Sequence, residues 1–219
     1  MALATLIGRD DMWPAWQRIT DEHSARVVSG ELSYDAMRRA RTKAFLADLG
    51  TPLDDDTVAV LEDRRLAQMR GAWRLFPDAA PCLDWLQTAG FKIAAVTNAS
   101  GPHQRARLAH VGLARYFDAV VSAGELGSAK PAAAIFHAAC AALEVSPAYA
   151  VHIGDRLDLD ATAAHAAGLH GVWLDRAATG VPAPDVTVIE TLADLPELLV
   201  SEYRTPMMTS ASGVPQPRS

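Results

Sequence analysis

The chain has 219 residues, of which 50% are hydrophobic and 21% charged, a composition typical of a globular protein. Its formal net charge of -6 leaves no basic surplus to bind the phosphates of nucleic acid or an acidic membrane surface. The sequence lacks the roughly 18 consecutive apolar residues of a membrane span, and its start lacks the basic residues of a signal peptide. Two cysteines, Cys82 and Cys140, lie in apolar helical patterns. We therefore expect a cytoplasmic protein with reduced, buried thiols.

Residues 10–72 have a helical pattern throughout, with no convincing strand. Residues that favour helix starts divide this region into three helices: Asp10 or Asp11, then Ser33, then Asp54 to Asp56. Pro14 is tolerated in the first turn of the first helix, and Gly50 ends the second. A short basic cluster in the second helix, Arg38-Arg39-Ala40-Arg41, is expected to form a solvated helix face.

From Phe76 onward, apolar runs and helical patterns alternate. The predicted strands are 92–97, 119–121, 150–153, 171–174 and 186–189. The predicted helices are 79–89, 102–110, 132–143, 158–167 and 192–200. This order predicts βαβ units that form a doubly wound parallel sheet with helices on both faces. The last stretch, 204–219, is rich in Ser, Thr, Pro and Gly and is predicted to be a disordered tail.

In a parallel sheet, ligands bind beyond the carboxyl ends of the strands. Three of the predicted strands are followed by polar residues: Thr97-Asn98, Lys130-Pro131 after the loop 124–127, and the acidic run from Asp155 to Asp160. A hydroxyl, an amide and an ammonium group can bind oxyanions, and carboxylates are ligands that Mg²⁺ accepts. Each element alone has an ordinary explanation as a strand former, a surface pair or a helix cap. Their combination at successive strand ends is more specific.

These residues, in this order, resemble motifs II, III and IV of the haloacid dehalogenase (HAD) superfamily. The matching segments are Ala95-Val96-Thr97-Asn98, Gly127-Ser128-Ala129-Lys130-Pro131 and His152-Ile153-Gly154-Asp155, with Asp160 following. The resemblance covers roughly residues 1–200 and implies a Rossmann-like α/β core made of residues 1–9 and 73–203. Residues 10–72 occupy the place of the helical cap that the phosphatase-like branch inserts after its first strand.

The resemblance also implies roles for individual residues. Thr97 would hold the transferring phosphoryl group with the backbone amide of Asn98, and Lys130 would steady the nucleophile and the phosphoryl oxygens. Asp155 would bind Mg²⁺, and Asp160 would support the metal directly or through water. The acidic fourth motif favours phosphoryl transfer over dehalogenation. The implied function is Mg²⁺-dependent hydrolysis of a small phosphorylated metabolite, a phosphate monoester, through an aspartyl-phosphate.

The first motif of the family, Asp-x-Asp-x-Thr-Leu at the end of a strand, is not matched. Aligning Thr5 and Leu6 with its tail puts Met1 at the position of the nucleophile and Leu3 at that of the acid/base. Neither side chain can perform these roles, and losing a covalent nucleophile costs several orders of magnitude in rate. We therefore expect this chain to be nearly inactive. The sheet should also have unpaired backbone and an open slot where the central strand belongs.

Three explanations for the unmatched motif stay open. The start codon of the natural enzyme could lie further upstream, so that in-frame codons for Asp-x-Asp precede Met1. The chain could instead be a degenerate member that binds a phosphate ligand or a protein partner, or it could have been shortened deliberately. A 2-haloacid dehalogenase is a weaker alternative. The sequence does not indicate the substrate or the oligomeric state.

Overall fold

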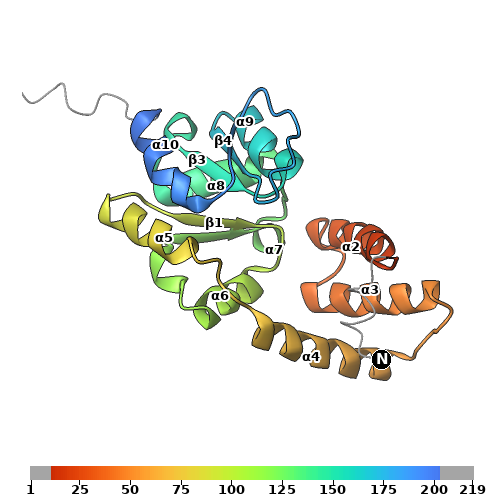
Figure 1. The fold of residues 1–219 in the computed structure, drawn as a ribbon. Helices are drawn as coiled ribbons and strands as arrows, with labels where there is room; N and C mark the ends of the chain where they lie inside the picture. The colour runs from red at the N-terminus through yellow and green to blue at the C-terminus, as the bar shows by residue number, and fades with distance from the viewer. Residues whose placement is uncertain (1–10, 203–219) are drawn as a thin grey trace, which may run out of the picture.

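The computed structural model describes residues 11–202. The predictions made for residues 1–10 and for the tail 204–219 lie outside the described residues. Three helices come first in the chain and gather on one side of the molecule, and an α/β region follows (Figure 1). No helix within residues 11–202 has the length and hydropathy needed to cross a membrane.

The first three helices, called the helical unit here, are α2 (Trp13–Val28), α3 (Tyr34–Asp48) and α4 (Asp55–Ala72). Two predicted caps are confirmed: the side chain of Ser33 accepts a hydrogen bond from Ala36 N at 3.2 Å, and that of Asp54 accepts one from Thr57 N at 2.8 Å. The predicted cap at Asp11 is wrong, because Met12 holds the N-cap position of α2 without a side-chain bond. Pro14 in the first turn removes one N–H that a cap would satisfy.

The interior of the helical unit contains both apolar and charged side chains. Trp16 packs edge-on against Phe45, with ring centroids 5.1 Å apart. The predicted solvated face on α3 is wrong for two of its arginines, since Arg38 and Arg41 are 4% and 7% exposed. They are buried because α4 brings Glu62, itself 0% exposed, against this face of α3.

The α/β region contains only parallel strand pairs within the described residues, as predicted. One sheet pairs β1 (Ala94–Thr97) with β2 (Ala119–Ser122). The other has the order β3-β4-β5, with bounds Val151–Gly154, His170–Leu174 and Thr187–Ile189. The remaining helices of this region are α5 (Ala79–Thr88), α6 (Gly101–His110), α7 (Ala123–Leu126), α8 (Ala133–Leu143), α9 (Thr162–Ala166) and α10 (Leu195–Ser201).

Two local predictions differ from the structure. The segment predicted as a loop at 124–127 contains the short helix α7, which ends at Gly127 with a φ of 73°. The helix predicted at 158–167 begins as a π-helical turn, Leu157–Ala161, and continues as α9. This wider turn holds the Asp160 side chain against the end of β3, where it contacts His152 and the backbone N–H of Arg156.

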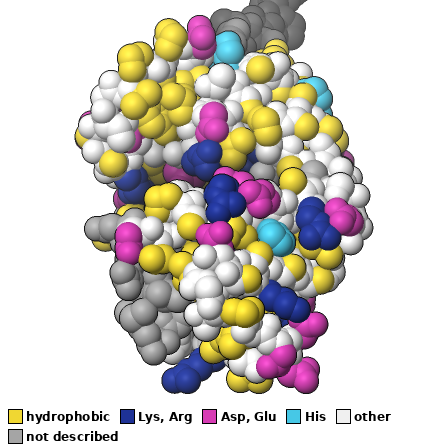
Figure 2. Space-filling view, turned by 90° about the vertical axis from the view of Figure 1, so that its right-hand side faces the viewer, with side chains coloured by type: hydrophobic (Ala, Val, Ile, Leu, Met, Phe, Trp, Pro, Cys, Tyr) yellow, Lys and Arg dark blue, Asp and Glu magenta, His cyan; other side chains and the backbone are white. Residues whose placement is uncertain are grey.

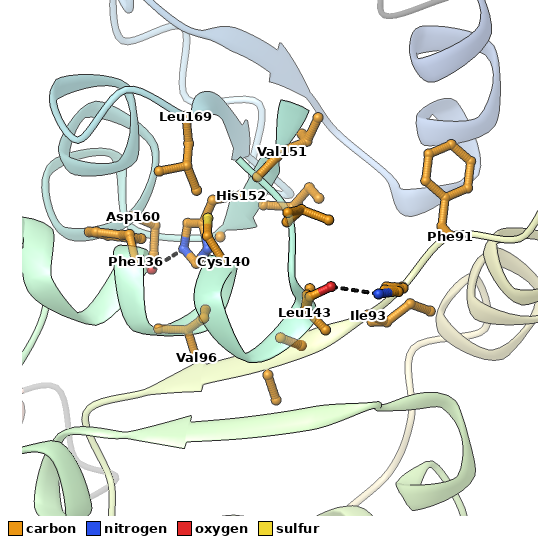
Figure 3. Close-up of a pocket in the computed structure, with 18 of the residues that line it drawn as sticks. Phe91, Ile93, Val96, Phe136, Cys140, Leu143, Val151, His152, Asp160 and Leu169 are labelled. Atoms are coloured by element: carbon orange, nitrogen blue, oxygen red, sulfur yellow. Dashed lines mark hydrogen bonds and ion pairs between the residues drawn. The ribbon is translucent and has the colours of Figure 1, made fainter. Parts of the chain in front are cut away.

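Helices cover both faces of the strands. On one face, α8 and α9 contribute Phe136, Cys140 and Ala164 to an apolar cluster, and on the other α5 and α10 pack against Val172 and Ile189. The two sheets are not hydrogen-bonded to each other within residues 11–202, and β1 and β3 are the strands that face the gap. A cavity of about 440 Å³ lies between them, lined by both strands and by α5, α8 and α10 (Figure 3). We call this cavity the strand slot.

Candidate active site

Asn98, directly after β1, fixes the loop that carries Lys130. Its side-chain Nδ2 donates to the backbone oxygen of Lys130 at 3.0 Å, and its Oδ1 accepts from the backbone nitrogen of Lys130 at 2.9 Å. The amide therefore clamps the lysine backbone from both sides. The clamp uses Oδ1 and one of the two N–H groups of Nδ2, so the second N–H of Nδ2 and the backbone N–H of Asn98 are left to contact an oxyanion.

Lys130 reaches from this clamp to the end of β3. Its Nζ donates to Asp160 Oδ1 at 2.6 Å, and the two side chains are 15% and 3% exposed. His152 Nε2 lies 3.1 Å from the same Asp160 oxygen (Figure 3). Although burial alone raises the pKa of Asp160, the bonds to His152 and Lys130 lower it to about 2. Asp160 therefore stays ionised and holds the ammonium group at the carboxyl ends of β1 and β3.

The turn after β3 places Asp160 at this position. The Asp160 carboxylate accepts from Arg156 N at 3.1 Å, and Asp160 N donates to Arg156 O at 2.8 Å, which closes the loop on itself. A side chain at Gly154 would collide with the Asp160 carboxylate, so this approach requires glycine. Gly154 thus has a steric reason that is independent of catalysis.

Among the other predicted site residues, Thr97 ends β1, and its Oγ1 accepts a hydrogen bond from Ala99 N at 3.1 Å. Asp155 is exposed, and its carboxylate makes no hydrogen bond or ion pair within residues 11–202. Asp155, Lys130 and Asp160 line the same end of the strand slot. The structure therefore brings Asn98, Lys130 and Asp160 into direct contact and leaves Asp155 open beside them.

The carboxylates after β3 leave few free oxygens for Mg²⁺. Asp158 pairs with Arg156 at 3.1 Å, and Asp160 is held by Lys130 and His152. No group of three or more His, Cys, Asp or Glu side chains within 11–202 could hold a metal ion. Asp155 is thus the one carboxylate of residues 155–160 that no other side chain holds. A single carboxylate suits Mg²⁺ only if substrate phosphate, water or residues outside 11–202 supply the other ligands.

The helical unit lies beside this edge of the sheets. The arrow of β1 points toward the helical unit (Figure 1), and Ala25 of α2 faces the loop 127–132 across a shallow hollow. Tyr34 at the start of α3 contacts the ring of His103 on α6, with centroids 5.1 Å apart. On this side of the molecule, charged side chains of both signs lie next to one another rather than forming a basic patch (Figure 2).

Sequence reasoning assigned no role to His152, although it is in direct contact with the site. The available signal was a polar residue in the otherwise apolar segment 150–153. Its ring packs edge-on against Phe136, with centroids 4.9 Å apart, which orients the imidazole toward Asp160. The predicted burial of the cysteines is confirmed, since Cys82 and Cys140 are both buried.

The chain is similar to known proteins of one family. The haloacid dehalogenase-like hydrolase family matches residues 4–168, and the chain belongs to this family. A glyceraldehyde 3-phosphate phosphatase from Methanopyrus kandleri is 40% identical over 101 residues, which are 46% of this chain and 43% of that protein. The chain spans about half the length of the curated relatives it matches.

Solved structures of both kinds of family member resemble the chain. A HAD phosphatase from Thermococcus onnurineus is 28% identical, with a TM-score of 0.59 over 84% of this chain and 78% of that one. A 2-haloacid dehalogenase from Pseudomonas syringae is 27% identical, with a TM-score of 0.62 over 90% and 84%. The fold is thus common to two chemistries, and the site residues must distinguish between them.

Proposed function

We propose that the chain carries the binding site of a Mg²⁺-dependent phosphohydrolase that acts on small organic phosphate monoesters. The observation that carries the proposal is the buried Lys130–Asp160 pair at the carboxyl ends of β1 and β3, with Asp155 open beside it. Phosphatases among the relatives point to the same chemistry. The helical unit, residues 10–72, would act as a cap over the site, and the protein would work in the cytoplasm.

In this proposal the residues of the chain have distinct tasks. Lys130, held by Asp160, neutralises phosphoryl oxygens, because an ammonium group is a strong donor to phosphate. The Thr97 hydroxyl and the backbone N–H of Asn98 bind the remaining oxygens. Asp155 would hold Mg²⁺, which supplies charge neutralisation when bound. The Asp160 carboxylate is already bonded to Lys130 and to the backbone N–H of Arg156. It would therefore support the metal site indirectly, by holding Lys130 and closing the loop after β3.

The nucleophile would be an aspartate that this sequence does not contain at the aligned positions. Met1 and Leu3 stand where the family has its two aspartates. We expect the 219-residue chain to release phosphate at least about 10³-fold more slowly than a version that carries an N-terminal strand ending in Asp-x-Asp. In-frame codons for such a strand upstream of Met1 would support the proposal.

The test measures phosphate release from glyceraldehyde 3-phosphate, phosphoserine and phosphoglycolate by both versions, with and without Mg²⁺. Mg²⁺-dependent release by the extended version alone is the expected result. Lys130→Met in the extended version should abolish release, whereas Lys92→Met, at the far end of the slot, should leave it unchanged. Metal-independent halide release from 2-chloropropionate would instead establish a dehalogenase.

Phosphate binding without turnover is the second candidate, and the residues at positions 1 and 3 favour it. It predicts that Mg²⁺ and inorganic phosphate together raise the melting temperature of the 219-residue chain, while the extended version still releases no phosphate. The absence of a thermal shift would count against both candidates.

A further inference from the structure

His152 and Lys130 bond the same oxygen of Asp160. Lys130 Nζ donates to Asp160 Oδ1 at 2.6 Å, and His152 Nε2 lies 3.1 Å from the same atom. Since the bonds keep the pKa of Asp160 at about 2 in spite of its burial, the carboxylate is ionised and can only accept hydrogen bonds. His152 Nε2 must therefore carry the hydrogen and donate it. The imidazole is part of the group of side chains that fixes the ammonium.

Two glycines allow the π-helical turn, Leu157–Ala161, to lie directly on the face of the sheet that carries His152. Side chains alternate between the two faces of a strand, so His152 and Gly154 share one face of β3, and Gly171 pairs with His152 on β4. A Cβ at Gly154 would collide with the Asp160 side chain, and a Cβ at Gly171 would collide with the backbone of the turn. The close approach of the turn thus brings Asp160 within reach of His152.

The imidazole and the ammonium differ in how firmly they are held. The His152 ring packs edge-on against Phe136, which is 0% exposed, with an interplanar angle of 80° (Figure 3). Lys130 instead reaches Asp160 on a flexible four-carbon stem. The ammonium can therefore occupy one position only if the carboxylate that it bonds is itself fixed.

The Asp160 carboxylate is fixed at both of its oxygens. His152 bonds Oδ1, and the backbone N–H of Arg156 bonds Oδ2 at 3.1 Å. Without the His152 donor, Lys130 would be the remaining partner of Oδ1, so the carboxylate and the ammonium could shift together. Such a shift matters for phosphate, because hydrogen bonds weaken steeply with misalignment and donors stabilise charge best when they are already in place.

We propose that His152 is a positioning residue for Lys130. Its imidazole N–H fixes the Asp160 carboxylate, and the carboxylate fixes the ammonium group that receives the phosphoryl oxygens. The part that concerns phosphate rests on the proposed function. The hold of His152 on the ammonium does not, and it can be measured without phosphate or metal.

The first test follows the Lys130 ammonium group in NMR spectra of the 219-residue chain. The chain has three lysines, and Lys43 and Lys92 are about half exposed, whereas the Lys130 side chain is 15% exposed. We expect the ammonium hydrogens of Lys130 to exchange with water more slowly than those of the other two. Replacing His152 by Leu or by Met keeps an apolar contact with Phe136 and removes the donor. Both variants should speed exchange at Lys130 about three- to tenfold, the worth of one hydrogen bond, and leave it unchanged at Lys92.

Two further variants separate positioning from packing. His152→Gln places an amide N–H near the position of Nε2, so it should restore slow exchange at Lys130. His137 is the matched control, because it is also a partly buried histidine with a single hydrogen bond, to the backbone oxygen of Ala167 at 2.8 Å. His137→Leu should leave exchange at Lys130 unchanged even where it lowers the melting temperature.

The second test asks whether the fixed ammonium matters for phosphate. Calorimetric titration with inorganic phosphate in the presence of Mg²⁺ should show affinity about three- to tenfold weaker in His152→Leu, and restored in His152→Gln. In Lys130→Met, adding His152→Leu should change the affinity no further, because His152 acts only through Lys130. A loss that comes from general destabilisation would persist in that background.

Three outcomes would overturn the proposal. These are unchanged exchange at Lys130 in both apolar variants of His152, an equal increase of exchange in His137→Leu, and failure of His152→Gln to restore slow exchange. A phosphate effect of His152→Leu that persists without Lys130 would overturn the route through the ammonium. An absence of phosphate binding by the wild-type chain, with the exchange results as expected, would overturn the proposed function and leave the positioning role standing.

Discussion

The helical unit and the α/β region differ in what their interiors contain. The helical unit encloses Glu62, which accepts hydrogen bonds from Arg38, Arg65 and Thr42 and is 0% exposed. The α/β region instead encloses an apolar slot of about 440 Å³. A helix satisfies its backbone within itself, whereas a strand depends on its neighbours. Three helices can therefore close around a charge that they contribute jointly, while within residues 11–202 the edges of β1 and β3 that face the slot have no strand partner.

The largest expected effect tests the buried charge. Glu62→Ala would leave Arg38, Arg41 and Arg65 facing one another without their carboxylate. Breaking a buried ion pair in this way costs about 3–5 kcal/mol of stability. Urea unfolding followed by circular dichroism measures the change.

The matched control for Glu62→Ala is Asp35→Ala. Asp35 also pairs with Arg38, but the Asp35 side chain is 76% exposed. An exposed ion pair contributes less than about 1 kcal/mol. Equal losses in the two variants would mean that the helical unit does not depend on its buried carboxylate.

The second prediction concerns a contact that joins the start of α5 to the segments after β4 and β5. Asp78, at the start of α5, accepts hydrogen bonds from Arg176 at 2.8 Å and from Thr191 at 2.7 Å, beyond β4 and β5. Asp78→Ala should cost about 2–3 kcal/mol, since it removes charge-assisted bonds. The control Gln87→Ala, at an exposed position on the same helix, should change stability little.

Acid should weaken this same contact. The hydrogen bond from Arg176 holds the pKa of Asp78 well below its usual range, against the opposing effect of burial. A lowered carboxyl pKa stabilises the fold fully above the unfolded pKa of about 4, and this contribution is lost as the pH falls further. The difference between wild type and Asp78→Ala should therefore shrink between pH 5 and pH 2 in urea titrations.

The third prediction tests whether the slot is open. Ala139 lies on α8 and lines the slot, so Ala139→Leu should fill part of it and stabilise the chain by about 1 kcal/mol. If another segment already fills the slot, overpacking should instead cost about 1–3 kcal/mol. The exposed Ala141→Leu on the same helix is the control and should change stability little. The sign of the Ala139 effect, read from the melting temperature, decides between the two cases.

The smallest expected effect lies where the helical unit meets the α/β region. Burial lowers the pKa of His103, and the nearby charges of Arg38, Arg70 and Arg107 lower it further, while Asp35 opposes them. Since the folded state disfavours protonated His103, its contribution to stability is present above pH 6.5 and is lost as the pH falls. Melting temperatures of wild type and His103→Gln between pH 8 and pH 5 measure this. Parallel curves for the two proteins would contradict the prediction.

Much of the fold could be predicted because the signals were local. Ser33 and Asp54 bond their own helix starts, and the apolar runs near 94–97 and 151–154 fit strands buried between helices. The burial of Arg38 and Arg41 was missed because it depends on Glu62, more than 20 residues away. The link between His152 and Asp160 was missed for a related reason, since a π-helical turn returns the chain to the strand.

The sequence by itself determined the order of strands and helices, the caps at Ser33 and Asp54, and the positions of Asn98 and Asp155 directly after strands. These follow from hydrophobic periodicity and from side-chain chemistry within a few residues of the backbone that they serve. Only the tertiary structure decided that Asp160 holds Lys130, that His152 contacts Asp160, and that Glu62 gathers three arginines. Such contacts join residues from different elements, so they exist only once those elements have packed together.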